Sequence, residues 1–314
     1  MKTAEAPNSA IAGDLAAAAV GRPPIAVRRF DTGLRHYVFE ATFDDRAPVV
    51  VRIAADHSRS AMAGALELSR LLRPRGVPLP EVIAEGLTHK FSHLVLERLP
   101  GTDLGDVIRG LSDSSVEVIA AKVAQAQRIT AKTASAGRYG YGVEPTDAPH
   151  ESWSQVLQDN LTRSRKRITA AKLFGQDVVD AVTKLVSEAS AELDALAPIP
   201  FLHDTTTKNV IVTAGGTFSG IVDVDDLCFG DPRYVIALTL ASLTASGGPL
   251  HYVDTWMRSA NYRDDRIFRL YVVLFLVDFM SEHGQAFNSN LRPSSADDRN
   301  RLFRIFAENL QRLD

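Results

Sequence analysis

The sequence predicts an α+β fold in which a small antiparallel β-sheet comes first and a mainly helical region follows. Three observations support this prediction: β-rich segments within residues 25–54, a change to helical composition after Pro100 and Gly101, and one β-hairpin pattern inside the helical part. The composition change divides the chain into an N-terminal lobe of residues 1–99 and a C-terminal lobe of residues 100–314.

The N-terminal lobe contains alternating strand and helix signals. The segments YVFEATF and PVVVRIA are rich in β-branched and aromatic residues and predict strands. Residues 59–73 predict a helix, because Ala61, Ala65, Leu68 and Leu72 recur at helical spacing. The segment HLVLERL predicts a further strand, which ends before Gly101.

The C-terminal lobe is predicted to be a helix bundle with one hairpin. Ser114 and Glu117 have the spacing of a capping box before a long alanine-rich helix, and residues 151–172 and 176–196 predict two more helices. Residues 209–223 differ, since NVIVT and TFSGIVD predict two strands joined by a turn at Gly215 and Gly216.

Composition excludes several classes of partner. A formal net charge of −3 and a hydrophobic fraction of 45% predict a globular chain that binds neither nucleic acid nor an anionic membrane surface. The apolar run at 271–277 is too short to span a bilayer, and the N-terminus lacks an export-signal pattern. Cys228 is the one cysteine, so no internal disulfide can form, and we expect a cytoplasmic protein.

Three oxygen-bearing side chains are predicted to meet at the open end of the hairpin. Folding about the glycine pair places Asn209 near Asp223, and cross-strand neighbours have Cβ atoms roughly 4.5 to 8 Å apart. An amide oxygen and a carboxylate suit a hard cation such as Mg²⁺. Asp204 precedes Asn209 on a segment that enters the same end, where it could act as a base.

These motifs resemble a known family. HDTTTKN followed by GIVDVDD is similar to the catalytic loop and metal-binding segment of the aminoglycoside phosphotransferase and choline kinase-like family, which has a two-lobed protein-kinase-like fold. The resemblance implies transfer of the γ-phosphoryl group of ATP to a hydroxyl of a small molecule. It implies that Asp204 accepts or orients the hydroxyl proton, and that Asn209 and Asp223 hold Mg²⁺.

The resemblance extends upstream in the order of the family, over roughly residues 28–240. FDTGLRHYVFEATF resembles a phosphate-binding hairpin containing Gly33, and VVVRIA resembles the third strand. These similarities imply that Arg52 contacts the phosphates and pairs with Glu67 of the next helix. LVLERLPG resembles the hinge strand, whose backbone around Glu97 to Leu99 would bind adenine, and FGDPRY also fits the family.

Three positions depart from the family pattern. Leu202 stands where the family usually has a histidine two residues before the catalytic aspartate, and His203 is adjacent instead. The phosphate hairpin has Gly33 as its one glycine, so close backbone approach to phosphate depends on a single position. Val235 replaces the acidic residue often found after the GDPxY motif, which should affect stability more than chemistry.

The site residues also have simpler interpretations. Asp204 could cap a turn, and Asn209 and Asp223 could be solvated hairpin ends. Of Asp225 and Asp226, we expect one to be exposed and the other to support the site.

The same holds for the charged residues nearer the phosphates. Arg52 could extend to water from an edge strand, and Glu67 could pair with Arg70 on the helix surface. Lys208 lies either near the phosphates or substrate or on an exposed loop.

Charged residues further along the chain leave alternatives open. A basic cluster forms either a solvated helix face or an anion site: Arg163, Arg165, Lys166 and Arg167. Asp278 and Glu282 share a helix face that could receive a cationic amine or remain exposed on the surface. Trp153 and Trp256 are expected in the core.

Two rival functions remain. The displaced His203 and the single glycine of the phosphate hairpin are compatible with a degenerate kinase-like protein that binds nucleotide or metabolite without turnover. The segment DVDD also matches the DxD motif of glycosyltransferases, which predicts alternating parallel strands and helices. The acceptor is open among aminoglycosides, other antibiotics and amino-alcohol metabolites.

Overall fold

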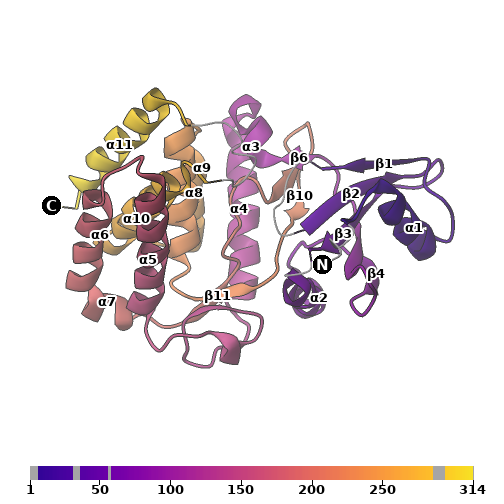
Figure 1. Ribbon diagram of the computed structural model, residues 1–314, viewed down its shortest axis with the longest axis horizontal. Helices are drawn as coiled ribbons and strands as arrows, with labels where there is room; N and C mark the ends of the chain where they lie inside the picture. Colours follow the sequence, from indigo (N-terminus) through magenta and orange to yellow (C-terminus); the bar gives the residue numbers. More distant parts are fainter. Residues whose placement is uncertain (1–5, 31–35, 56–57, 286–293, 314) are drawn as a thin grey trace. The chain divides into compact units, whose positions relative to one another are not determined.

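A computed structural model describes residues 6–30, 36–55, 58–285 and 294–313 (Figure 1). The chain forms two compact units: Met1–Pro100 together with Gly220–Asp226, and Gly101–Ser219 together with Leu227–Asp314. The division follows Pro100, where the composition changes. Segment Gly220–Asp226 belongs to the first unit, although the linear division of the sequence assigned it to the C-terminal lobe.

The first unit contains a five-stranded antiparallel sheet with the strand order β1-β2-β3-β5-β4. Its strands are β1 (Ala26–Arg29), β2 (His36–Thr42), β3 (Val49–Ala54), β4 (Val82–Gly86) and β5 (His93–Glu97). The accompanying helices are α1 (Ser9–Val20), α2 (Arg59–Leu72) and the short η2 (Arg73–Arg75).

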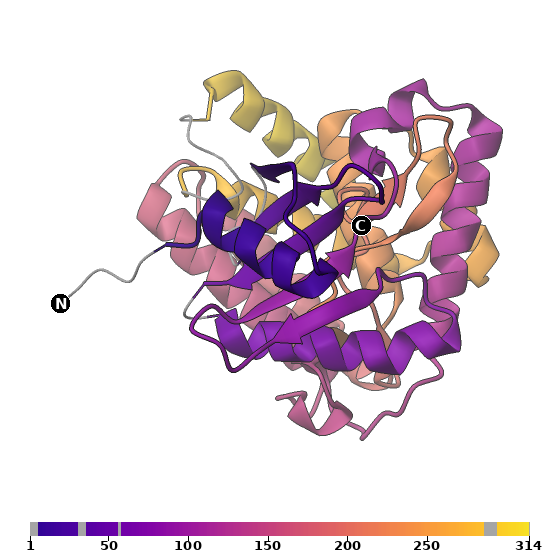
Figure 2. The same ribbon diagram turned by 90° about the vertical axis from the view of Figure 1, so that its right-hand side faces the viewer.

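Alternation along β3 determines what each face of the sheet contacts. Val51 and Ile53 belong to the core cluster that includes Ala12 and Ala16 of α1. Small alanines let α1 lie close across this face, as Figure 2 shows. Arg52 therefore points to the opposite face.

The second unit is mainly helical (Figure 1). Its larger helices are α4 (Asp113–Thr130), α5 (Trp153–Ala171), α6 (Asp177–Glu188), α8 (Arg233–Ser246), α9 (His251–Ala260), α10 (Arg266–Glu282) and α11 (Ala296–Leu310). Short elements are β6 (Thr102–Asp103), α3 (Leu104–Val107), η3 (Ile108–Gly110), β7 (Gly140–Gly142), η4 (Pro145–Asp147), α7 (Ser190–Asp194), β8 (Ile199–Phe201), β9 (Val210–Val212) and β11 (Leu227–Gly230). Strand β10 (Phe218–Ile221) begins in this unit, and its last two residues belong to the first.

Helix α10 is the central helix of this unit. Its apolar residues are buried almost all round, because α5, α6, α8 and α11 pack against it. Trp153 and Trp256 are 0% and 1% exposed, so their predicted core positions are confirmed. Two small sheets have the orders β10-β9-β6 and β7-β11-β8, and the second of them leads into the loop that follows β8.

The local sequence signals were correct for the long helices and the main strands and wrong in several details. Helix α4 is capped by Ser112, whose side chain accepts from Ser115 N, and not by the predicted Ser114. The single helix predicted over 176–196 is two helices, α6 and α7, with Ala189 between them. Strands β4, β6, β7, β8 and β11 were not predicted.

The parallel, alternating architecture that a glycosyltransferase would need is contradicted, since the paired strands of the main sheet are antiparallel. Among the described residues, no helix is long and apolar enough to cross a membrane.

Candidate active site

The loop between β8 and β9 carries the predicted base, and α4 holds its start. Gln127 Nε2 donates to Leu202 O at 2.9 Å and to Thr205 Oγ1 at 2.7 Å. Leu202 N in turn donates to Gln127 Oε1 at 3.0 Å. One buried amide thus satisfies both backbone groups of Leu202 and fixes the loop just before Asp204.

The rest of the loop is closed by local hydrogen bonds. Asn209 Nδ2 donates to the backbone oxygen of Asp204 at 2.8 Å, and Asn209 N donates to Thr206 O at 3.0 Å. Thr205, Thr206 and Thr207 are buried, whereas Asp204 and Lys208 are exposed. The fold therefore presents the Asp204 carboxylate on a rigid turn.

His203 contacts an aromatic side chain from β7. Its ring lies edge-on to that of Tyr141, with centroids 4.9 Å apart. The register of the small sheet explains this contact, since Tyr141 and Phe201 both lie opposite Cys228 of β11. The displaced histidine is thus a residue of the loop that packs against β7.

In the first unit, Arg52 binds two aspartates. Its Nη1 lies 2.6 Å from Asp225 Oδ1, and its Nη2 lies 2.9 Å from Asp225 Oδ2 and 2.5 Å from Asp223 Oδ1. His36 Nε2 lies 3.1 Å from Asp225 Oδ2. Arg52 is 6% exposed, so the two-point pairing with Asp225 compensates a buried charge.

Asp225 stays ionised in this network. Burial raises the pKa of its carboxyl, but the hydrogen bond to His36 and the charge and hydrogen bonds of Arg52 outweigh burial and bring the pKa to about 2. The aspartates likewise raise the pKa of Arg52 against the opposing effect of burial. Asp225 therefore supports Arg52. Asp225 and Asp226 are both partly buried, so the expectation that one of them is exposed was wrong.

Asp223 has the features of a cation ligand. Its backbone φ is 63°, an uncommon value for a residue other than glycine. Its side chain is 52% exposed although it also pairs with Arg52. An exposed carboxylate is a suitable Mg²⁺ ligand, and so is the amide oxygen of Asn209. Across the described ranges, no group of three or more His, Cys, Asp or Glu side chains forms a metal cluster.

The three predicted catalytic residues belong to different units. Asp204 and Asn209 are in the second unit, and Asp223 is in the first. Their convergence stays a prediction from the sequence.

The expected pairing of Arg52 with Glu67 differs from the structure. Arg52 pairs with Asp223 and Asp225, and Glu67 is exposed on α2. Arg52 pairs with the aspartates because Asp225 binds both terminal nitrogens of the guanidinium. Such two-point pairing is strong and geometrically specific.

Three nucleotide-site candidates remain, and two of them lie at the end of β5 or just after it. Glu97 ends β5 and accepts from Glu81 N at 3.1 Å, while Leu99 is 8% exposed. Gly33 lies outside the described residues.

The FGDPRY motif is a buried structural network. Asp231 accepts from Arg233 Nε at 2.9 Å and from Tyr271 Oη at 3.0 Å, and Tyr271 accepts from Trp153 Nε1 at 2.8 Å. Val235 is 0% exposed. These hydrogen bonds anchor the start of α8 through Asp231. The polar anchor expected at position 235 is therefore replaced by contacts elsewhere in the motif.

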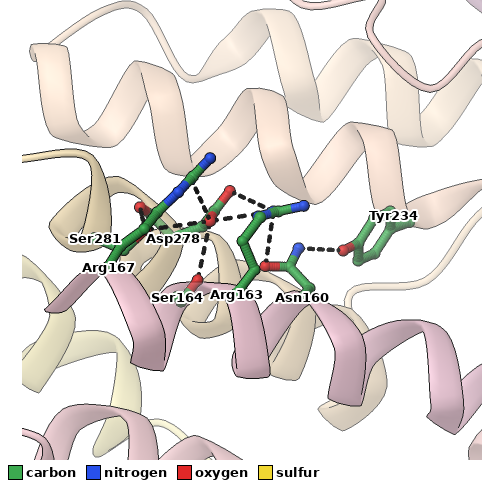
Figure 3. Close-up of polar contacts among 7 residues, drawn as sticks. All are labelled: Asn160, Arg163, Ser164, Arg167, Tyr234, Asp278 and Ser281. Atoms are coloured by element: carbon green, nitrogen blue, oxygen red, sulfur yellow. Dashed lines mark hydrogen bonds and ion pairs between the residues drawn. The ribbon is translucent and has the colours of Figure 1, made fainter. Parts of the chain in front are cut away.

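A second polar cluster joins α5 and α10 (Figure 3). Asp278 accepts from Arg163 Nη2 at 3.1 and 3.2 Å and from Ser164 Oγ at 2.9 Å. Arg167 Nη1 lies 3.7 Å from Asp278 Oδ1. The side chain of Asp278 is 13% exposed, so the expectation of an exposed surface aspartate was wrong.

Solved structures define the class of fold. A GDP complex of a mutant aminoglycoside 2'-phosphotransferase-IIIa matches with a TM-score of 0.68 and 15% identity, covering 97% of this chain and 98% of that one. The ternary complex of APH(2'')-IIa with streptomycin and ATP matches with a TM-score of 0.65 and 14% identity, covering 98% and 97%. The fold is therefore the protein-kinase-like fold of the aminoglycoside phosphotransferases.

The sequence itself identifies the family. Residues 26–270 match the model of the phosphotransferase enzyme family, APH, and the chain belongs to that family. This range includes both the Arg52 network and the loop of Asp204. A search of curated proteins gave no match.

Proposed function

We propose that the protein transfers the γ-phosphoryl group of ATP to a hydroxyl group of a small molecule. Family membership supports phosphotransfer, and the site motifs support the role of each residue. Asp204 is the base, Asn209 and Asp223 hold Mg²⁺, and the acceptor is a hydroxylated metabolite or antibiotic.

The observation that carries the proposal is the construction of the Asp204 loop. Holding an exposed side chain in one position costs conformational entropy. Gln127 and Asn209 nevertheless fix the backbone on both sides of the Asp204 carboxylate. A turn that merely capped itself would not need a buried amide from another helix. Preorganisation of this kind is what phosphoryl transfer requires, because catalysis rests on positioning and charge stabilisation.

Each residue of the chain has a defined task in the proposal. Asp204 accepts the proton of the attacking hydroxyl, and Arg52 orients the carboxylate of Asp223. When bound, Mg²⁺ neutralises charge on the phosphates. Lys208, Gly33 and the backbone from Glu97 to Leu99 bind the nucleotide, whereas Glu67 takes no part in holding Arg52.

The first test is Asp204→Asn. Loss of a positioned general base should lower kcat roughly 10²- to 10⁴-fold, while Mg²⁺-ATP still raises the melting temperature. ATP consumption across a panel of hydroxylated compounds measures the effect. Asp44→Asn is the matched control, because Asp44 is exposed between β2 and β3, and it should retain wild-type turnover.

Two outcomes would contradict the proposal. Near-wild-type turnover in the Asp204→Asn variant would remove this residue from the role of base. Nucleotide binding by the wild-type protein with no turnover of any compound would favour the degenerate binding protein instead.

A further inference from the structure

Two arginines of α5 contact Asp278 of α10, the acidic residue that would bind a cationic substrate. Arg163 and Arg167 are one helical turn apart and therefore share a face. Both are directed at Asp278, as Figure 3 shows. Asp278 also accepts from Ser164 Oγ at 2.9 Å, so its oxygens are engaged by groups of the protein itself.

The charge balance of this cluster is positive. One carboxylate lies between two guanidinium groups, which leaves a formal excess of one positive charge. Arg163 makes its contacts with Asp278 and Asn160 through Nη2, and 47% of its side chain is exposed. A guanidinium presents five donors, so this geometry can hold a carboxylate and still face an incoming anion.

Lys208 adds to the positive charge of the Arg163–Arg167–Asp278 cluster, and the carboxyl group of Glu282 offsets little of that charge. Burial, followed by the charge of Asp278, raises the pKa of Glu282 to about 7. The charges of Arg167, Lys208 and Arg163 act in the opposite direction, which places all three within electrostatic reach of Glu282. Near neutral pH, Glu282 is therefore only partly ionised.

The cluster lies beside the loop that carries the proposed base, within the second unit. Lys208 follows Asp204 by four positions on that loop. On the other side, Tyr141 packs against His203, the neighbour of Asp204. Burial lowers the pKa of Arg163, but Asp278 and then the hydroxyls of Tyr234 and Tyr141 raise it above its ordinary value. Tyr141 therefore packs against a residue of the loop and lies within electrostatic reach of Arg163.

We infer that the acceptor of the phosphoryl group carries an anionic group, a carboxylate or a phosphate, which Arg163 and Arg167 bind while its hydroxyl faces Asp204. The inference rests on the proposed function and narrows its substrate class. A polycationic acceptor is disfavoured, because Asp278 is already neutralised and a like-charged ligand would face the excess positive charge. Planar oxyanions match the guanidinium fork.

Small polyols with a common carbon frame and different charge test the inference. Glycerol, glycerate, glycerol phosphate and the aminodiol serinol share a three-carbon frame, and ATP turnover and equilibrium binding are measured for each with wild-type protein. Glycerate or glycerol phosphate should give a kcat/KM at least about tenfold above that of glycerol, with serinol the poorest. The two anions separate carboxylate from phosphate recognition.

Variants of α5 then locate the anion. Arg163→Gln and Arg167→Gln should each raise KM for the preferred anion about tenfold while kcat for glycerol is retained. Lys166→Gln is the matched control, because Lys166 is an exposed cation on the same helix, and it should leave KM unchanged. Each variant is checked for an unaltered melting temperature.

Binding separates failure of this inference from failure of the proposed function. Anions that bind wild-type protein and lose affinity in both variants, without any ATP turnover, would uphold the anion site and reject the kinase activity. Turnover that favours serinol, equal turnover of all four compounds, or absence of anion binding would overturn the inference. An unchanged KM in both variants would also overturn it.

Discussion

Arg52 lies in the middle of strand β3 with 6% of its surface exposed, and a guanidinium at that depth needs a carboxylate partner. Asp225 provides two oxygens to it and also contacts His36. The same arginine reaches Asp223. One buried cation thus links the stability of the first unit to the orientation of a proposed metal ligand.

Removing the charge of Asp225 should destabilise the protein. Asp225→Asn leaves a buried guanidinium without its main partner, a change that typically costs about 3–5 kcal/mol in the free energy of unfolding. Urea unfolding measures the loss, and Asp44→Asn should stay within about 0.5 kcal/mol of wild type. The double variant Arg52→Met with Asp225→Leu should recover much of the loss. A single variant as stable as wild type would show that the ion pair contributes nothing.

The same pair predicts loss of stability in acid. The folded-state pKa of Asp225 is about 2, below its ordinary value of 3.8. A depressed pKa stabilises the folded state above the unfolded-state pKa, and this contribution of about 2 kcal/mol disappears as pH falls from about 4 to 2. Unfolding free energies of wild type and Asp225→Asn should therefore converge across that window. Parallel pH profiles through this range would contradict the prediction.

Among the elements, α4 connects the bundle to the catalytic loop through a single buried side chain. Gln127 is 7% exposed, and its amide satisfies both backbone groups of Leu202. Apolar neighbours such as Val123 and Ala124 provide the packing of the helix, so the glutamine is not needed to bury it. Its position is explained by the loop.

Replacing this glutamine should loosen the loop. Gln127→Met keeps the side-chain volume but leaves the buried N–H and C=O groups of Leu202 without these hydrogen-bond partners. The expected cost is about 1–3 kcal/mol in unfolding free energy. The kcat for ATP consumption should fall while nucleotide affinity is retained, because the base moves and the nucleotide site does not. Gln125→Met on the exposed side of the same helix is the control. Equal kinetics in the two variants would rule out a positioning role for Gln127.

The elements show what sequence patterns can and cannot predict. Strands β2, β3 and β5 and the long helices follow from apolar periodicity, which acts over a few residues. Strand β4 was missed because VIAEG, at the sheet edge, has little β-branched alternation. Asp204, Asn209 and Asp223 were chosen by motif and spacing. Asp225 was left undecided and Gln127 was missed, since their partners lie 173 and 75 positions away in the chain.

At the scale of the whole molecule, the first unit is assembled from two separate parts of the chain. Segment Gly220–Asp226 completes it after more than half of the second unit has been passed in sequence. Ile221 N donates to Pro78 O at 2.8 Å, and Asp223 and Asp225 bind Arg52. The sequence composition predicts a single boundary between the lobes, because it carries no signal that a later segment of the chain returns to the first unit.

This interleaving predicts that residues 1–100 alone do not fold cooperatively. The fragment keeps its sheet residues but lacks the bond to Pro78 and both partners of Arg52, so a buried charge stays unpaired. Joining residues 220–226 to it through a flexible Gly/Ser linker should restore a sigmoidal thermal transition, followed by circular dichroism. The same fusion with Asp225→Asn is the control and should melt without a transition. If the bare fragment melts as sharply as the fusion, then Arg52 does not depend on the returning segment, because the sheet and α1 alone would provide enough stability to bury it.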